Sequence, residues 1–132
     1  MIKKFLVFTF LSALLLLFSG EISAQAKQRV RFAKGASNFT VSGTISGYAY
    51  RDYIVGARAG QMLSAKLNSK NTFTVLTVFK PDGENLEGAT KMDEFTAELP
   101  ENGDYVVRVL MMRAEARRKN SMSKYRVRIS IQ

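Results

Sequence analysis

Four basic residues stand close together near the C-terminal end of the chain, at Arg113, Arg117, Arg118 and Lys119. Arg113 and Arg117 are four residues apart, so in a helical turn their side chains would share one side, with Arg118 beside them. Arginine carries a planar, permanently charged fork that binds carboxylates or phosphates through two hydrogen bonds. The spacing indicates a binding site for an acidic partner. The alternative is a solvated tip whose charges only aid solubility.

The positive charge of the chain is concentrated around this cluster. The formal net charge is +9, and the stretch from Arg108 to Arg128 holds eight basic residues against Glu115 as its only acidic one. The stretch from Lys27 to Val107 is nearly balanced, with ten basic and nine acidic residues. This asymmetry predicts an acidic partner that contacts one region of the molecule.

The composition argues against most kinds of active site. The chain has no histidine and no cysteine, which excludes Ser-His-Asp and Cys-His nucleophiles and the common zinc sites. A site made of carboxylates alone remains conceivable, but Asp93 and Glu94 would point to opposite faces of an extended segment. The acidic residues from Asp82 to Glu87 match no EF-hand spacing. We therefore expect no enzyme, no bound metal and no cofactor.

Three tyrosines lie close together in the sequence, at Tyr48, Tyr50 and Tyr53. Tyr53 continues an alternating apolar pattern and is expected in the core. Tyr48 and Tyr50 follow a break at Gly47, where tyrosine often serves as an interface anchor with an apolar body and a polar tip. Packing inside the fold is an equally good interpretation for these two residues. With the neighbouring Arg51 they form a second candidate binding surface.

Period-two alternation of apolar and polar residues, typical of half-buried strands, recurs along most of the chain after residue 26. The clearest strand covers residues 39–46, and a final hairpin is expected from residues 104–112 and 125–132, joined by the basic segment. The hairpin would place Tyr105, Val107, Tyr125 and Val127 inward. Further strands are expected at residues 29–34, 53–57, 62–67, 73–79 and 95–99, and residues 84–94 are expected to form a loop that could hold a short strand.

No segment after residue 26 shows sustained helical periodicity. Seven to nine short strands separated by turn residues predict an all-β fold, an antiparallel β-sandwich. Strand counting alone does not separate a sandwich from a closed barrel, so the barrel stays open as the alternative.

The first twenty-six residues are typical of a signal peptide. Lys3 and Lys4 precede an apolar run from residue 5 to residue 18, and the small-x-small pattern Ala24-Gln25-Ala26 follows. We predict cleavage after Ala26, which leaves residues 27–132 as a single domain and places the protein in the periplasm or outside the cell. The alternative is an uncleaved membrane anchor.

Two groups of residues resemble a known family. The run Tyr105-Val-Val-Arg-Val-Leu-Met-Met-Arg113, continuing to Arg117 and Arg118 and closing on Tyr125-Arg-Val, is similar to the C-terminal half of bacterial periplasmic inhibitors of g-type (goose-type) lysozyme. A second match joins Ser42-Gly-Thr-Ile-Ser-Gly-Tyr48-x-Tyr50 to Ala59-Gly-Gln61. The Ala-Gly-Gln and Asn-Gly-Asp-Tyr portions also resemble the wider pre-peptidase C-terminal β-sandwich superfamily.

The resemblance implies a non-catalytic protein that plugs the substrate cleft of a g-type lysozyme. Arg113, Arg117, Arg118 and Lys119 would face the cleft carboxylates, with Tyr48, Tyr50 and Arg51 beside them. A runner-up function is binding of anionic envelope polymers, such as lipopolysaccharide, through the basic hairpin. Nucleic acid is not expected as a partner of an exported protein, nor is a membrane after cleavage, and the sequence does not indicate an oligomeric state.

Overall fold

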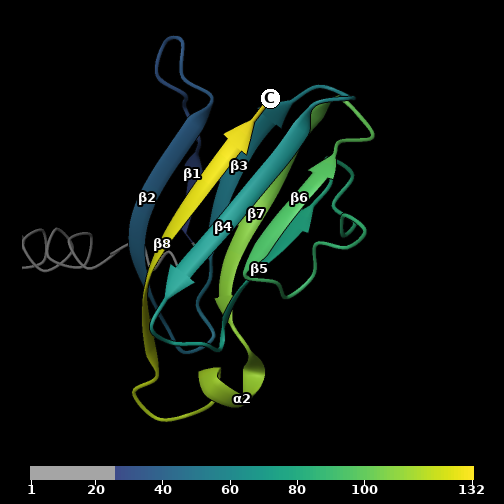
Figure 1. Ribbon diagram of the computed structural model, residues 1–132. Coiled ribbons are helices and arrows are strands. Elements are labelled where there is room, and N and C mark those ends of the chain that lie inside the picture. The colour runs from purple at the N-terminus through teal and green to yellow at the C-terminus, as the bar shows by residue number, and fades with distance from the viewer. Residues whose placement is uncertain (1–25) are drawn as a thin grey trace, which may run out of the picture.

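Two four-stranded sheets pack face to face in the computed structural model, which describes residues 26–132 (Figure 1). The first sheet has the order β1-β3-β7-β5 and the second has the order β2-β8-β4-β6. We call them sheet A and sheet B. The strands are β1 (Ala26–Arg29), β2 (Asn38–Ser46), β3 (Arg51–Ala57), β4 (Met62–Ser69), β5 (Thr74–Phe79), β6 (Glu94–Glu98), β7 (Gly103–Met111) and β8 (Met122–Ile131).

The predicted all-β sandwich is confirmed, and the described residues contain eight strands, within the expected range. Every strand pair is antiparallel except β1 and β3, which run parallel. The exception follows from the path of the chain, because β2 crosses to sheet B and β3 then returns to sheet A in the direction of β1. The signal peptide predicted for residues 1–26 lies outside the described residues except for Ala26, which opens β1 beside Arg51.

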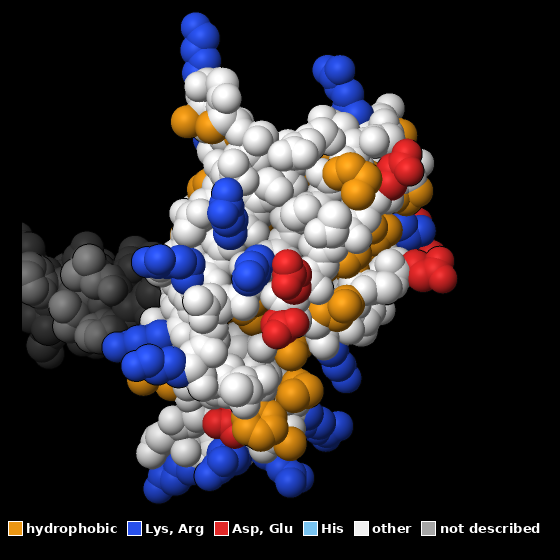
Figure 2. Space-filling view, in the orientation of Figure 1, with side chains coloured by type: hydrophobic (Ala, Val, Ile, Leu, Met, Phe, Trp, Pro, Cys, Tyr) orange, Lys and Arg blue, Asp and Glu red, His pale blue; other side chains and the backbone are white. Residues whose placement is uncertain are grey.

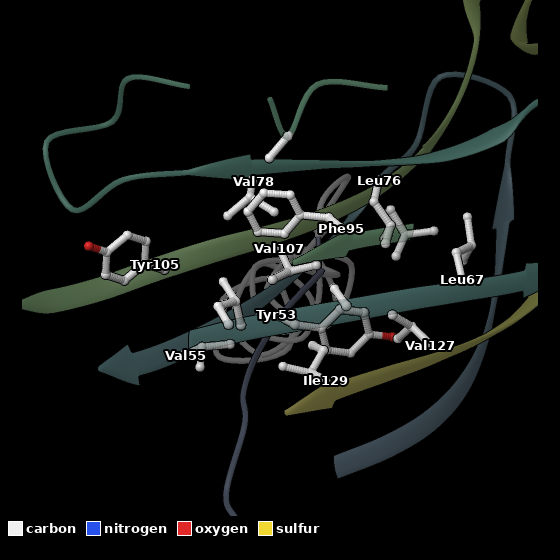
Figure 3. Packing of buried hydrophobic residues seen from close by; sticks show 14 of the residues in the cluster. Tyr53, Val55, Leu67, Leu76, Val78, Phe95, Tyr105, Val107, Val127 and Ile129 are labelled. Carbon is white, nitrogen blue, oxygen red and sulfur yellow. The ribbon is translucent and has the colours of Figure 1, made fainter. Parts of the chain in front are cut away.

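The core forms where the alternating apolar residues of both sheets meet. Tyr53, Val55, Tyr105, Val107 and Val109 from sheet A are fully buried against partners from sheet B. The sheet B side is supplied by Leu63, Ala65, Phe95, Val127 and Ile129, of which Figure 3 labels Phe95, Val127 and Ile129. Burial of these side chains removes apolar area from water at about 25 cal/mol per Å², which is the main stabilising contribution to the fold.

The two sheets are also joined by hydrogen bonds between buried side chains. The Tyr53 and Tyr125 hydroxyls lie 2.7 Å apart, and Tyr53 belongs to sheet A while Tyr125 belongs to sheet B. Nearer the β7 to β8 connection, the hydroxyls of Thr74 and Ser123 lie 2.6 Å apart. Buried polar groups are tolerated because each finds a partner.

One expectation about a single element was wrong. The first strand was expected at residues 29–34, but it ends at Arg29. Val30 still donates its amide hydrogen to the carbonyl of Ile54 and is buried, and the chain then leaves the sheet. The loop expected at residues 84–94 is confirmed up to Glu94, where β6 begins. Isolated bridges at Asn85 and Met92 pair this loop with β5.

The predicted C-terminal hairpin is also wrong, since β7 lies in sheet A and β8 lies in sheet B. The connection between them, residues 112–121, passes from one sheet to the other across the end of the sandwich, where the short helix α2 (Arg113–Ala116) lies (Figure 1). Alternating burial is the same for two paired strands and for two strands that face each other across a core, so periodicity could not distinguish these arrangements.

Candidate functional site

The basic stretch that drew attention in the sequence is divided by the fold into three places. Arg108 lies on β7 in sheet A, the residues from Arg113 to Lys119 form the end of the sandwich around α2, and the basic residues Lys124, Arg126 and Arg128 lie along β8 in sheet B. Figure 2 shows Lys and Arg side chains gathered at the α2 end, with hydrophobic side chains between them. The binding surface is therefore not one hairpin, and each part has its own neighbours.

The connection between β7 and β8 takes a helical turn, which is the condition under which Arg113 and Arg117 were expected to share one side. The Arg117 amide donates to the Arg113 carbonyl at 3.1 Å, which places these two residues one turn apart. Ala116 is buried, so α2 is seated on the protein on that side. Ser121 fixes the return of the chain by donating from its hydroxyl to the Ala116 carbonyl at 3.1 Å. The arginines are thus carried by a short but anchored turn.

The four basic residues of this turn differ in their freedom to bind a partner. Arg113 and Arg117 are exposed, and within residues 26–132 neither forms an ion pair. Arg118 lies 3.4 Å from Glu115 through its Nη1 atom, although its side chain remains 71% exposed. Lys119 is exposed beyond it. Arg113 and Arg117 are therefore the two guanidinium groups best placed to meet an acidic group of another molecule.

Tyr48 and Tyr50 lie beside this turn although they are far from it in sequence. The Gly47 amide donates to the Ser121 carbonyl at 3.1 Å, which ties the tyrosine segment to the arginine segment. One hollow of about 430 Å³ is lined by both tyrosines and by Arg113, together with Val75, Lys91, Leu110, Met111 and Met112. Tyr48 is 64% exposed, which is unusual for so large a ring. The structure thus brings together three of the residues singled out in the sequence.

Exposed apolar side chains surround the same end of the molecule. The Met112 amide donates a hydrogen bond to the Phe73 carbonyl at 2.8 Å, so Phe73 is held next to α2. Phe73, Met92 and Met122 are each more than a third exposed. An apolar surface rimmed by arginine is typical of a protein interface.

Arg51 does not share a face with Tyr50. It precedes Asp52 in β3, and successive side chains of a strand point to opposite faces, so Arg51 lies on the inward side with Tyr53. Its positive charge acts to lower the pKa of the buried Tyr125 hydroxyl. Burial and the hydrogen bond with Tyr53 nevertheless raise the pKa of Tyr125 far above its ordinary value. Arg51 is half-buried at the end of the core, and its predicted role in binding stays a prediction.

Sequence reasoning missed the residue that holds Tyr50. Arg108 lies with its guanidinium carbon 3.8 Å from the centre of the Tyr50 ring and 4.7 Å from the centre of the Phe79 ring. Its Nε and Nη2 atoms donate to the two oxygens of Asp52 at 2.8 and 3.0 Å. Asp52 is buried, and its hydrogen bonds with Arg108 raise the pKa of Arg108 above the usual value. Period-two alternation could not show that β3 and β7 are neighbours, so it could not bring Arg108 and Asp52 together.

Other kinds of site find no support in the described part of the chain. Between residues 26 and 132 no three His, Cys, Asp or Glu side chains come close enough together to hold a metal ion. The same residues include no helix with the length and apolar character needed to cross a membrane.

Comparison with known proteins gives a consistent assignment. No family model matches the sequence. The inhibitor of g-type lysozyme from Escherichia coli K12 is 32% identical over 126 residues, which cover 89% of this chain and 90% of that protein. The pre-peptidase C-terminal domain of a collagenase from Bacillus anthracis shares only the fold, with a TM-score of 0.53 at 12% identity over 80% of this chain and 94% of that one.

Two crystal structures of periplasmic inhibitors of g-type lysozyme are also similar. The Aeromonas hydrophila protein has a TM-score of 0.71 at 29% identity, over 82% of this chain and 97% of that one. The Salmonella Typhimurium protein has a TM-score of 0.66 at 33% identity, over 81% and 98%. Sequence identity across nearly the whole length, together with the shared sandwich, shows that the chain belongs to the family of inhibitors of g-type lysozyme.

Proposed function

We propose that this protein inhibits a g-type lysozyme in the periplasm by inserting the α2 turn into the substrate cleft of the enzyme. The observation that carries the proposal is the meeting of Tyr48, Tyr50 and Arg113 around one hollow, with Arg117 one turn away. The protein contributes shape and charge to this complex and performs no reaction of its own. The predicted signal peptide, residues 1–26, would deliver residues 27–132 to the compartment named for the related inhibitors.

Charge complementarity supports the insertion of arginine. Glycoside hydrolases act with a pair of carboxyl groups that flank the scissile bond, so the floor of a muramidase cleft is locally negative. Arg113 and Arg117 carry exposed guanidinium groups that could form two-point hydrogen bonds with such carboxylates. Arg118 and Lys119 would add positive charge at the rim, where it accelerates encounter more than it strengthens the complex.

The tyrosines would supply the apolar part of the contact. A cleft that binds a polysaccharide presents surfaces to the faces of sugar rings, and a tyrosine ring can fill such a subsite. Tyr48 is exposed enough to do this, while Tyr50 is held against Arg108. Aromatic and arginine side chains dominate the binding energy of many interfaces, which is why we assign the largest contributions to Tyr48, Arg113 and Arg117.

The test is a cell-wall lysis assay in which residues 27–132 are titrated against a g-type lysozyme, with c-type and i-type enzymes alongside. We expect near-stoichiometric inhibition of the g-type enzyme. The Arg113→Ala/Arg117→Ala double variant should lose at least tenfold in inhibitory potency. Its free energy of unfolding should stay within about 0.5 kcal/mol of the wild type, since both side chains are exposed.

A charge-matched control separates the site from general electrostatics. Arg31 and Lys34 are exposed in the β1 to β2 connection, at the end of the sandwich away from α2 (Figure 1). The Arg31→Ala/Lys34→Ala variant removes the same charge and should inhibit like the wild type. Equal potency of both double variants would overturn the assignment of the α2 turn, and no inhibition of any lysozyme by the wild type would overturn the function.

A further inference from the structure

The largest of the described hollows lies on the outer face of sheet B and is lined by none of the arginines and tyrosines proposed to contact lysozyme, although its end at Asn71 and Met122 borders the α2 turn. Its volume is about 950 Å³, and it is lined by Ser42, Gly43, Thr44, Asn68, Ser69, Lys70, Asn71, Met122, Lys124, Tyr125 and Arg126. Three of these residues are basic and none is acidic. The remaining polar ones carry hydroxyl or amide groups, which can both donate and accept hydrogen bonds.

The register of sheet B explains how these groups come together. β8 is paired with β2 on one side and β4 on the other. Arg126 lies opposite Ser42 on β2 and opposite Asn68 on β4, and Lys124 lies opposite Thr44. All of these positions alternate with the buried core residues, so their side chains belong to the outer face. A row of cations along the middle strand is thus flanked by neutral hydrogen-bonding groups.

The basic side chains of this face form no ion pairs within the described part of the protein. Lys70, Lys124 and Arg126 form no ion pair with any residue from 26 to 132, and Lys124 and Arg126 are exposed. The row continues along β8 to Arg128, which lies opposite Lys66. Like charges directly opposite each other on paired strands are destabilising. Figure 2 shows Lys and Arg side chains over β2, β8 and β4, while acidic side chains lie toward β6.

We propose that this outer face of sheet B is a second binding site, separate from the lysozyme site, and that it binds an anionic polysaccharide. Phosphate or carboxylate groups of the polymer would pair with Lys124, Arg126 and Lys70. Sugar hydroxyls would form hydrogen bonds with Ser42, Thr44 and Asn68. The exposed Met122 offers an apolar surface to the face of a sugar ring.

The geometry favours a long polymer over a single anion. At about 3.3 Å per residue along a strand, Lys124 and Arg128 are separated by about 13 Å, so the cations form a line that one extended chain can follow. A line of separate charges strengthens binding to a polymer because each further contact is intramolecular. The hollow is open rather than deep, which suits a polymer chain that lies along the surface.

The experiment measures binding of dextran sulfate, with uncharged dextran as the neutral probe, by isothermal titration calorimetry at about 0.15 M salt. The Lys124→Gln/Arg126→Gln variant should lose at least tenfold in affinity for dextran sulfate. The Arg113→Gln/Arg117→Gln variant has the same net charge and should stay within about twofold of the wild type. In the lysozyme assay the Arg113→Gln/Arg117→Gln variant should lose inhibitory potency, and the Lys124→Gln/Arg126→Gln variant should inhibit like the wild type. Failure of one site is therefore distinguishable from failure of the other.

Nuclear magnetic resonance locates the site without any variant. Dextran sulfate should shift the amide signals of residues 42–44, 68–71 and 122–126. Shifts confined to residues 113–119, equal losses of affinity in both variants, or equal binding of uncharged dextran would each overturn the proposal. Displacement of dextran sulfate by an equal charge concentration of single-stranded DNA would overturn the assignment to a polysaccharide.

Discussion

Arg108 is stacked on Tyr50 and at the same time bonded through two nitrogens to Asp52. The guanidinium carbon lies 3.8 Å from the centre of the Tyr50 ring, and Asp52 is only 3% exposed. A buried carboxylate fixes the plane of the guanidinium, and that plane supports the ring. Tyr50 lines the hollow next to Arg113, so this pair of contacts links the framework of sheet A to the proposed lysozyme site.

Replacing Arg108 by lysine tests this support. Arg108→Lys keeps the charge but loses the two-point bond and the flat surface, so we expect inhibition to weaken by about five- to tenfold with little loss of stability. Arg108→Ala leaves Asp52 buried without its partner and should cost about 3 kcal/mol in the free energy of unfolding. Urea denaturation and lysis assays give the two readouts. A lysine variant with wild-type potency would show that Tyr50 needs no such support.

Tyr105 should matter for stability and not for inhibition. Its hydroxyl donates to the Glu101 carbonyl at 2.7 Å and accepts from the Glu101 amide at 3.1 Å. Tyr105→Phe leaves both backbone groups without this partner, and we expect a loss of about 1 to 3 kcal/mol in the free energy of unfolding. Lysis assays below the unfolding temperature should give wild-type potency, because Tyr105 lies at the start of β7 and α2 follows its end. A loss of potency without a loss of stability would contradict this assignment.

The buried Tyr125 hydroxyl predicts a loss of stability in alkali. Its pKa is raised in the folded protein, chiefly by burial, so the folded state holds a proton that the unfolded chain releases above about pH 10. The free energy of unfolding therefore falls as the pH rises above that value. Urea titrations from pH 8 to pH 11 should show a steeper fall for the wild type than for Tyr125→Phe. Parallel curves would exclude this contribution.

Gly43 is expected to tolerate no side chain. It lies opposite Tyr125 on the paired strands, and a Cβ atom added there would come within 2.7 Å of the Tyr125 Cζ atom. Gly43→Ala should therefore displace the ring and cost about 1 to 3 kcal/mol in the free energy of unfolding. The matched control is Ser42→Ala, whose side chain faces outward and whose stability should stay close to that of the wild type. Equal unfolding midpoints for the two variants would contradict the close packing.

The sequence was sufficient for most of the strands and for the residues they bury, because period-two alternation is a local property. Tyr105, Val107, Tyr125 and Val127 are all buried, as their pattern predicted. The sequence was not sufficient for the partner of each strand, so β7 and β8 were wrongly paired. The contact between Arg108 and Tyr50 depends on that missing information. The closeness of Tyr48 to Arg113 was expected only from the resemblance to a known family.

The crossing of the chain from sheet A to sheet B has a consequence for the kinetics of binding. The α2 turn is held at one end by β7 and at the other by β8, so the turn has already lost its conformational entropy when the protein folds. A loop that is already ordered loses little more freedom when it enters a cleft. Loosening the turn, for example by Ala116→Gly, should therefore slow association as well as hasten dissociation, whereas removal of a single contact in the bound state should act mainly on dissociation.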